Sequence, residues 1–226
     1  MEPIKRYAVY YAPPAGDFAD RASAWLGWDA ARGQMVTQPG LGLDAAAITT
    51  EPRRYGFHGT IKPPFRLAPG RDHAGLGAAL ADLAANLAPV TLPGLRLKNL
   101  DGFLALVPEG DTAPLRDLAA AVVERLDVFR APLNEAEIAR RRPERLSPRQ
   151  RELLDLWGYP YVMEEFRFHL TLTDRLPPDQ ADGVADILRA HFAPVLPRPF
   201  VIGSLCLCGQ VESGQFHLLH RYTLSG

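Results

Sequence analysis

The sequence repeats one pattern in two places, Phe57-His58-Gly59-Thr60-Ile61-Lys62 and Phe168-His169-Leu170-Thr171-Leu172-Thr173. In both stretches apolar and polar residues alternate, which is typical of a strand with one buried face. Successive side chains of a strand point to opposite faces, so each histidine shares a face with the threonine two positions on. The pattern therefore predicts two strands that each present an imidazole beside a hydroxyl.

The segments that follow the two stretches have the same predicted order of elements. Each continues with paired prolines, a helix and a hairpin. The spacing from His58 to the turn residue Gly102 differs by one residue from the spacing between His169 and Gly214. Equivalent elements at nearly equal offsets indicate an internal duplication.

The duplication predicts a mixed α/β protein of the α+β type, built as a single bilobal domain over 1–226. The N-terminal lobe is expected to cover 1–112 with the first motif. The C-terminal lobe is expected to cover 113–226 with the second motif, and to include an Arg-rich connector at 134–151. Each lobe would be an antiparallel sheet with helices on its outer face, and the two lobes would face each other across a central groove.

Hydrophobic spacing and turn residues predict the individual elements. Strands are expected at 6–12, 57–62, 90–98, 103–107, 168–173, 200–208 and 216–224. Helices are expected at 17–28 and 72–87, from 113 onward and up to 192. The stretch 29–55 is punctuated by Gly and Pro and has no pattern that assigns it.

The overall composition is that of a globular protein. Of 226 residues, 47% are hydrophobic and 23% are charged, which excludes a disordered or fibrous chain. The net charge of -1 provides no chain-wide basic field for non-specific binding of nucleic acid. Neither an apolar run of membrane-spanning length nor a secretory cleavage pattern is present, and the two cysteines, Cys206 and Cys208, are not expected to form a disulfide. We expect a cytoplasmic protein.

Two imidazoles directed at one site suit the cleavage of a phosphoester. Their ordinary pKa lies near neutrality, so one can take a proton from the attacking group while the other gives a proton to the leaving alkoxide. Hydroxyl donors such as Thr60 and Thr171 can stabilise the phosphoryl oxygens. The sequence does not determine which histidine is the base.

The paired motifs resemble those of the two-histidine (2H) phosphoesterase superfamily, whose signature is two H-x-[S/T]-x motifs in a duplicated α/β fold. The surrounding residues, Arg53 to Phe65, Trp157 to Tyr161 and Phe166 to Leu172, are similar to a bacterial branch associated with phosphonate-utilisation operons. The resemblance covers most of the chain. It implies metal-independent cleavage of a cyclic phosphodiester or of a 2',5'-type linkage. His58 and His169 would be catalytic, Thr60 and Thr171 would bind phosphate, and a small ribose cyclic phosphate is a candidate substrate.

Other residues near the motifs are candidates for substrate binding. Lys62 shares the predicted face of His58 and Thr60, so it fits either a phosphate ligand or a solvated lysine. Arg167 shares the predicted polar face with His169. Three aromatic residues fit either stacking on a base or ribose, or ordinary packing. These are Tyr10, Tyr55 and Tyr161.

Six arginines form the strong basic run of the chain: Arg140, Arg141, Arg142, Arg145, Arg149 and Arg151. They fit either a clamp over an anionic substrate or an exposed charged helix pair, and the interspersed glutamates favour the second interpretation. Near the C-terminus, Cys206, Cys208, His217 and His220 raise the question of a zinc site. The two histidines are three apart on a predicted strand and point to opposite faces, so we predict no metal and no cofactor.

The expected partner is a small phosphorylated substrate, such as a nucleotide, an RNA end or a ribose cyclic phosphate, with no membrane and no obligate protein partner. The alternative is a non-catalytic RNA or nucleotide-binding module that uses the same groove. Such a module needs no acid and base, so the two intact motifs speak against it. A metal-dependent hydrolase using the C-terminal Cys and His residues is a third hypothesis.

Overall fold

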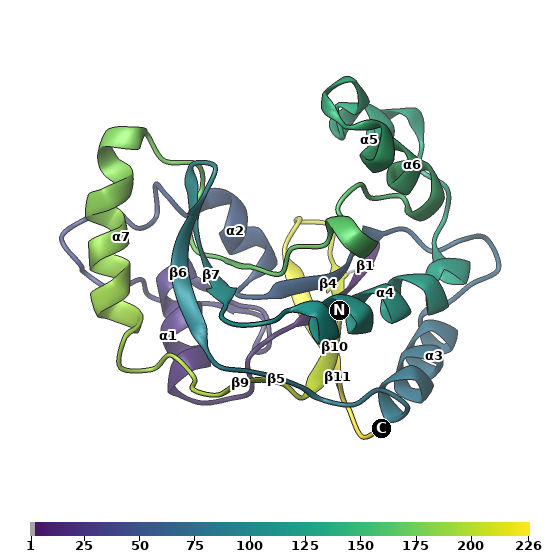
Figure 1. Ribbon diagram of the computed structural model, residues 1–226, viewed down its shortest axis with the longest axis horizontal. Helices are drawn as coiled ribbons and strands as arrows, with labels where there is room; N and C mark the ends of the chain where they lie inside the picture. The colour runs from purple at the N-terminus through teal and green to yellow at the C-terminus, as the bar shows by residue number, and fades with distance from the viewer. Residues whose placement is uncertain (1–2) are drawn as a thin grey trace.

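A computed structural model describes residues 3–226, and an antiparallel sheet of seven strands forms the centre of the molecule (Figure 1). The strand order is β11-β10-β1-β4-β8-β7-β6. The bounds are β1 Arg6–Tyr11, β4 Gly59–Phe65, β6 Leu95–Leu100, β7 Phe103–Pro108, β8 Leu170–Thr171, β10 Ser204–Gln210 and β11 Phe216–Thr223. Two short pairs complete the strands, β2 Trp28–Asp29 with β3 Gln34–Met35, and β5 Val90–Leu92 with β9 Phe200–Ile202. The predicted mixed α/β class with antiparallel strands is confirmed.

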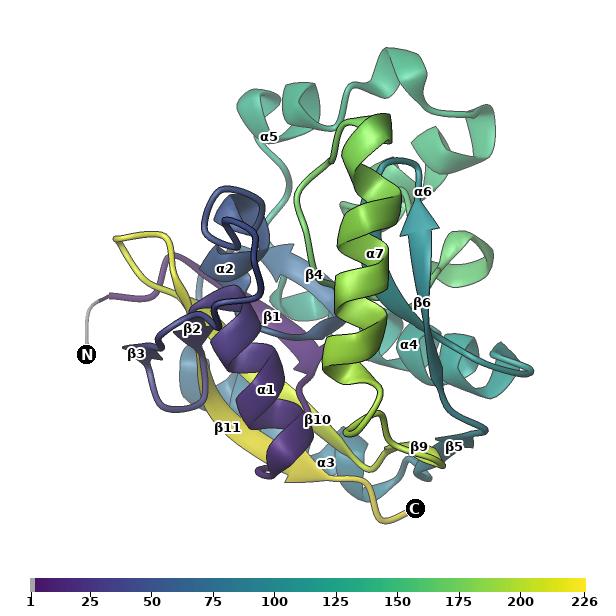
Figure 2. The ribbon, with the colours of Figure 1, turned by 90° about the vertical axis from the view of Figure 1, so that its left-hand side faces the viewer.

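Helices surround this sheet. Within residues 3–226 they are α1 Asp17–Leu26, α2 Thr50–Tyr55, α3 His73–Ala85, α4 Ala113–Arg125, α5 Glu135–Arg140, α6 Pro148–Trp157 and α7 Pro178–Phe192. Helix α7 contacts β6 and β7, α3 contacts β10 and β11, and α4 contacts β4. Helices α1 and α7 lie side by side (Figure 2), and the Arg21 guanidinium of α1 donates to the His191 carbonyl of α7 at 2.6 Å. The two lobes are thus the two ends of one sheet, each with its own helices.

The strand order has a two-fold pattern. The motif strands β4 and β8 are neighbours at the centre, β1 and β7 flank them, and β10 and β6 follow outside. The chain order β1-α1-β4-α3-β5-β6 corresponds to β7-α4-β8-α7-β9-β10. The duplication expected from the motifs is therefore visible in the topology.

The two halves of the chain exchange strands. Strand β7 of the first half lies beside β8 of the second, with β6 outside it, and β10 of the second half lies beside β1 of the first, with β11 outside it. The correspondence of elements is closest when the second unit begins at β7, whereas we predicted a boundary after residue 112. That division of the domain stays a prediction.

Alternation along the central strands separates two faces. Val9 and Tyr11 of β1 belong to the main core under the helices, together with Ile61 of β4. Tyr10 lies on the opposite face, in a small cluster with Phe216. It pairs in register with Thr60, which places both on the side of the sheet away from the main core.

Most predicted elements are present, with changes at their ends. The strand expected at 90–98 is divided into β5 and β6, and the strand expected at 200–208 is divided into β9 and β10. The second motif strand is short, covering only Leu170–Thr171. The unassigned stretch 29–55 contains α2, and the Arg-rich connector forms α5 and α6, which rise together from the body of the molecule (Figure 1). None of the helices within 3–226 has the length and apolar content needed to span a bilayer.

Candidate functional site

The two motifs meet where β4 and β8 pair. Gly59 is the register partner of Leu170 in this antiparallel pair. Antiparallel register then sets His58 opposite Thr171 and Thr60 opposite His169. The two His-x-Thr units therefore lie side by side and head to tail on one face of the sheet.

The same hydrogen bond orients both imidazoles. Nδ1 of His58 lies 2.8 Å from the carbonyl oxygen of Gly56, and Nδ1 of His169 lies 2.8 Å from that of Arg167. A carbonyl oxygen only accepts, so each Nδ1 carries the proton. Each Nε2 is then the nitrogen that remains for chemistry. In the first motif the Thr60 hydroxyl lies 3.3 Å from Nε2 of His58.

Burial keeps His58 neutral. The pKa of His58 is lowered from 6.5 to about 4, chiefly by desolvation, with a smaller lowering by the imidazole of His169, while the bond to Gly56 acts in the opposite direction. Burial disfavours the charged form because the cation loses its hydration. At neutral pH the His58 ring therefore offers an unprotonated Nε2, the form that a general base requires.

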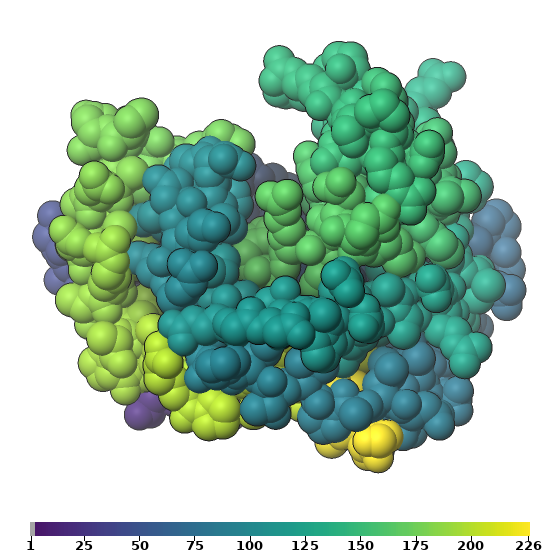
Figure 3. Space-filling view, viewed as in Figure 1, coloured from purple at the N-terminus to yellow at the C-terminus, as the bar shows by residue number. Residues whose placement is uncertain are grey.

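A groove of about 870 Å³ opens over this face. His58 and Thr60 of the first motif and Thr171 of the second line it. His169 lies beside it, with its ring 5.7 Å from the ring of Phe103, which also lines the groove. Figure 3 shows the molecule hollowed between the arm of α5 and α6 and the side formed by β6, β7 and α7. The volume suits a small organic ligand.

Two of the predicted aromatic residues contact His58. The ring of Tyr10 lies 4.0 Å from the His58 ring, centroid to centroid, and the ring of Tyr55 lies 5.7 Å away. Both tyrosines line the groove. The Tyr10 hydroxyl is buried and has no hydrogen-bond partner among the described residues. A buried polar group usually has a partner, so this hydroxyl is available to a bound molecule or water.

Two other predicted residues lie elsewhere. Tyr161 is 47% exposed and packs against Tyr159, and it is Tyr159 that lines the groove. Arg167 is exposed, and its backbone carbonyl, rather than its guanidinium, holds His169. The side chains of Tyr161 and Arg167 are not among those that line the groove, and their part in substrate binding stays a prediction.

Lys62 points away from the groove, contrary to the predicted face. The register between β1 and β4 shifts between the pairs Tyr10–Thr60 and Val9–Lys62, which marks a β-bulge. A bulge adds a residue to one strand and breaks the alternation, so Lys62 turns to the other side of the sheet. There its side chain is buried, and it lies outside the set that lines the groove.

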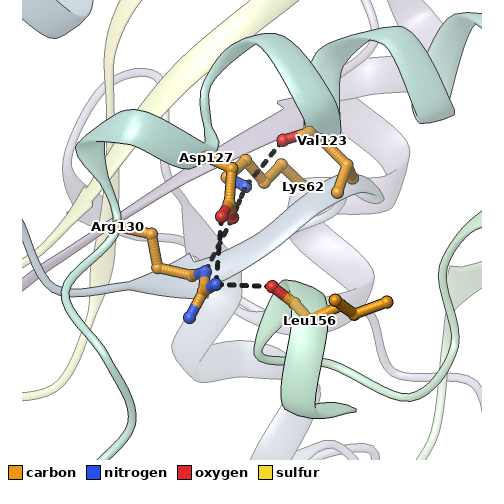
Figure 4. A network of polar contacts seen from close by, with 5 residues as sticks. All are labelled: Lys62, Val123, Asp127, Arg130 and Leu156. Atoms are coloured by element: carbon orange, nitrogen blue, oxygen red, sulfur yellow. Dashed lines mark hydrogen bonds and ion pairs between the residues drawn. The ribbon is translucent and has the colours of Figure 1, made fainter. Parts of the chain in front are cut away.

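Lys62 belongs instead to a structural network (Figure 4). Its ammonium group donates to the Val123 carbonyl at 3.1 Å and to Asp127 at 3.3 Å. Asp127 also accepts two bonds from Arg130, at 2.7 and 3.0 Å, and Arg130 donates to the Leu156 carbonyl at 2.9 Å. Burial lowers the pKa of Lys62 to about 8, and Asp127 opposes this effect. The network ties the first motif strand to α4 and to the end of α6.

Four arginines line the groove. They are Arg6, Arg140, Arg141 and Arg175. The sequence left Arg140 and Arg141 open between a clamp over an anionic substrate and an exposed helix pair, and it did not indicate Arg6 and Arg175 as site residues. Strand alternation could have revealed Arg6, because it lies four positions before Tyr10 and hence on the same face of β1.

Metal ligands are not clustered within residues 3–226, where no group of three or more His, Cys, Asp or Glu side chains is placed to hold an ion. Cys206 and Cys208 are buried free thiols on β10. Desolvation raises the pKa of both.

Comparison with known proteins gives two curated relatives. The chain is 37% identical over 222 residues to ribose 1,5-bisphosphate phosphokinase PhnN of Janthinobacterium sp. (strain Marseille), over 94% of this chain and 49% of that protein. It is 39% identical over 222 residues to the protein of the same name from Laribacter hongkongensis (strain HLHK9), over 96% and 51%. The chain spans about half the length of the curated relatives it matches.

A solved structure and a family model also match. E. coli LigT complexed with NADP+ is similar with a TM-score of 0.44 and 14% identity, over 99% of each chain. A family model described as "Protein of unknown function (DUF1045)" matches residues 60–217, which is more than half of the sequence. The chain therefore belongs to the DUF1045 family.

Proposed function

We propose that this protein is a phosphodiesterase that opens a cyclic phosphodiester by two-histidine acid and base catalysis. The observation that carries the proposal is the pairing of Gly59 with Leu170, which brings two His-x-Thr units together at one groove. A structural role alone does not account for two imidazoles held in the same tautomer by the same backbone contact.

The proposed step is the attack of water on phosphorus. Nε2 of His58 takes a proton from the water as its oxygen bonds to phosphorus. The bond from phosphorus to one ring oxygen breaks, and protonated His169 gives its Nε2 proton to that oxygen. The hydroxyls of Thr60 and Thr171 donate to the phosphoryl oxygens as charge develops. Both imidazoles then exchange protons with solvent before the next turnover, and no proton is gained or lost overall.

The low pKa of His58 supports its assignment as the base. A base must be unprotonated before attack, and burial holds His58 in that state at neutral pH. The hydrogen bond to Gly56 directs the free electron pair of Nε2 away from the backbone. His169 is then left as the acid.

The proposed substrate is a ribose 1,2-cyclic phosphate. The curated relatives are named as kinases of ribose 1,5-bisphosphate, a sugar that carries phosphate on C1. Breaking the bond from phosphorus to O2 of a 1,2-cyclic phosphate leaves a monoester on C1. The product shares the C1 phosphate monoester of the sugar for which these kinases are named. This likeness supports a role in phosphonate metabolism, which the sequence resemblance also implied.

Phosphorus NMR in the presence of EDTA tests this proposal. Ribose 1,2-cyclic phosphate, a 2',3'-cyclic nucleotide and a 2',5'-linked dinucleotide are each incubated with the protein. We expect the ribose ester to be converted to a monoester fastest. Tight binding without conversion would indicate the nucleotide-binding module instead, and conversion only after metal is added would overturn the metal-independent mechanism.

A further inference from the structure

We propose that the groove contains a second anionic subsite, formed by Arg140 and Arg141 at the end of α5, which binds a phosphate group remote from the bond that is cleaved. This inference rests on the proposed phosphodiesterase function and specifies its substrate as a cyclic phosphodiester that also carries a phosphate monoester.

The three acidic residues that line the groove, Glu51, Glu137 and Asp174, already have hydrogen-bond or ion-pair partners. Glu137 accepts two hydrogen bonds from Arg66, at 3.0 and 2.9 Å. Asp174 accepts the backbone N–H groups of Thr50 at 2.8 Å and Glu51 at 3.0 Å. The Glu51 carboxylate lies 3.6 Å from the guanidinium of Arg54. Glu137 and Glu51 are thus paired with Arg66 and Arg54, which do not line the groove, while Asp174 keeps its charge, so the four lining arginines outnumber the carboxylates left to balance them.

Those arginines carry charge without a matching carboxylate. Across residues 3–226, none of the four guanidinium groups lies within 4.0 Å of an Asp or Glu oxygen. Arg6 donates to the amide oxygen of Gln210 at 2.7 Å, and Arg175 donates to the Asp101 carbonyl at 2.5 Å. The groove is therefore an electropositive surface.

The positive charge of these four arginines exceeds what is needed to bind a cyclic phosphodiester. Such an ester carries one negative charge, which the motif threonines can bind as hydrogen-bond donors. A phosphate monoester adds about 1.5 to 2 further negative charges near pH 7. Arginine forms paired hydrogen bonds to phosphate oxygens, and two adjacent arginines on one wall match a terminal phosphate.

The two arginines of α5 are held in place over the groove. The two-bonded ion pair from Arg66 to Glu137 fixes α5 to the segment that follows β4. Arg66 lowers the pKa of Glu137 to about 2, so this pair is ionised throughout the neutral range. The guanidinium of Arg141 lies 4.6 Å from the centre of the Tyr159 ring, a cation–π contact. The arm of α5 and α6, which borders the hollow in Figure 3, therefore holds Arg140 and Arg141 beside the groove.

A pair of substrates that differ by one phosphate tests the subsite. Ribose 1,2-cyclic phosphate and its 5-phosphate are compared in the wild type, in the double variant Arg140→Ala/Arg141→Ala, and in Arg145→Ala as a control on the same arm. We expect the wild type to prefer the 5-phosphorylated ester. The double variant should reduce the ratio of the two kcat/KM values at least 30-fold, and Arg145→Ala should not change it. An equal loss on both esters, or no loss, would overturn the subsite.

Calorimetric binding separates this inference from the proposed function. Ribose 1,5-bisphosphate and ribose 1-phosphate are titrated into the same three proteins. A loss of at least 30-fold in affinity for the bisphosphate alone would support the subsite even if neither cyclic ester were opened, a result that would overturn the proposed function. Equal affinities of the wild type for the two compounds would overturn the subsite even if both esters were opened.

Discussion

The ring of Phe168 lies directly above Gly59 where the two motif strands pair, so close that a methyl group on Gly59 would lie 2.2 Å from Cζ of the ring. The glycine is needed here for space. The first motif has glycine between its His and Thr, and the second has Leu170 at the equivalent position. Gly59 of the first motif thus leaves space for the ring of Phe168, the residue that precedes His169 of the second motif.

Gly59→Ala should separate the two motifs. The added methyl group overpacks a tight contact, and we expect a loss of about 1–3 kcal/mol in the free energy of unfolding. Activity should fall at least ten-fold because the imidazoles move apart. Gly183→Ala on α7 is the control, since a methyl group there meets nothing within 4 Å and should raise stability slightly. Chemical denaturation and kcat/KM report the two effects, and a fully active Gly59→Ala protein would contradict the role assigned to this contact.

Removal of either imidazole should abolish most of the activity. We expect His58→Ala and His169→Ala each to lower kcat by about 10² to 10⁴ because one proton transfer is lost. The melting temperature and circular dichroism spectrum should remain close to those of the wild type. If either variant lost less than a few-fold in kcat, that histidine would have no place in the mechanism.

The pH dependence of kcat/KM should reflect the lowered pKa of His58. Because the pKa of this base is lowered to about 4, the acidic limb of the profile should lie near pH 4 rather than near 6.5. The unfolded chain binds more protons than the folded chain between these values. The contribution of His58 to stability is therefore complete above about 6.5 and is lost as pH falls toward 4. NMR titration of the imidazole measures this pKa directly, and a value near 6.5 would contradict the assignment.

Tyr10→Phe should lower activity without lowering stability. The hydroxyl is buried without a partner, so its removal should leave the free energy of unfolding unchanged or raise it by up to about 1 kcal/mol. If the hydroxyl bonds to the substrate, kcat/KM should fall about ten-fold, which corresponds to one hydrogen bond. Unchanged kinetics in the variant would show that the substrate does not use this group.

Lys62→Met should affect stability and not substrate binding. The variant loses the buried bonds to Val123 and Asp127, and we expect a loss of about 1–3 kcal/mol in the free energy of unfolding. The KM should stay within two-fold of the wild type. Lys98→Met is the matched control because Lys98 is exposed. A large rise in KM without a loss of stability would restore Lys62 as a phosphate ligand.

The sequence predicted the central features of the fold because they depend on alternation and repetition. Period-two spacing gave the shared face of His58 and Thr60, and the repeated motif gave the duplication. The same rule failed two residues later at Lys62, since a bulge depends on the pairing with β1 and leaves no local signature.

Other features depend on tertiary contacts. Helix α2 is short and lies in a stretch without hydrophobic periodicity, so its stability comes from packing rather than from propensity. The orientation of α5 depends on the ion pair from Arg66 to Glu137, which joins residues far apart in sequence. For this reason the sequence alone does not decide between a clamp and a solvated helix pair for the arginine run, two members of which line the groove.

The exchange of strands between the halves has a consequence for synthesis on the ribosome. Strand β1 (Arg6–Tyr11) is synthesised long before one of its two neighbours, β10 (Ser204–Gln210), with which it pairs. Until then one edge of an apolar strand is open to pairing with other chains. Closure of that edge must therefore wait until β10 has been synthesised, and a chaperone that covers β1 during this interval should raise the yield of native protein.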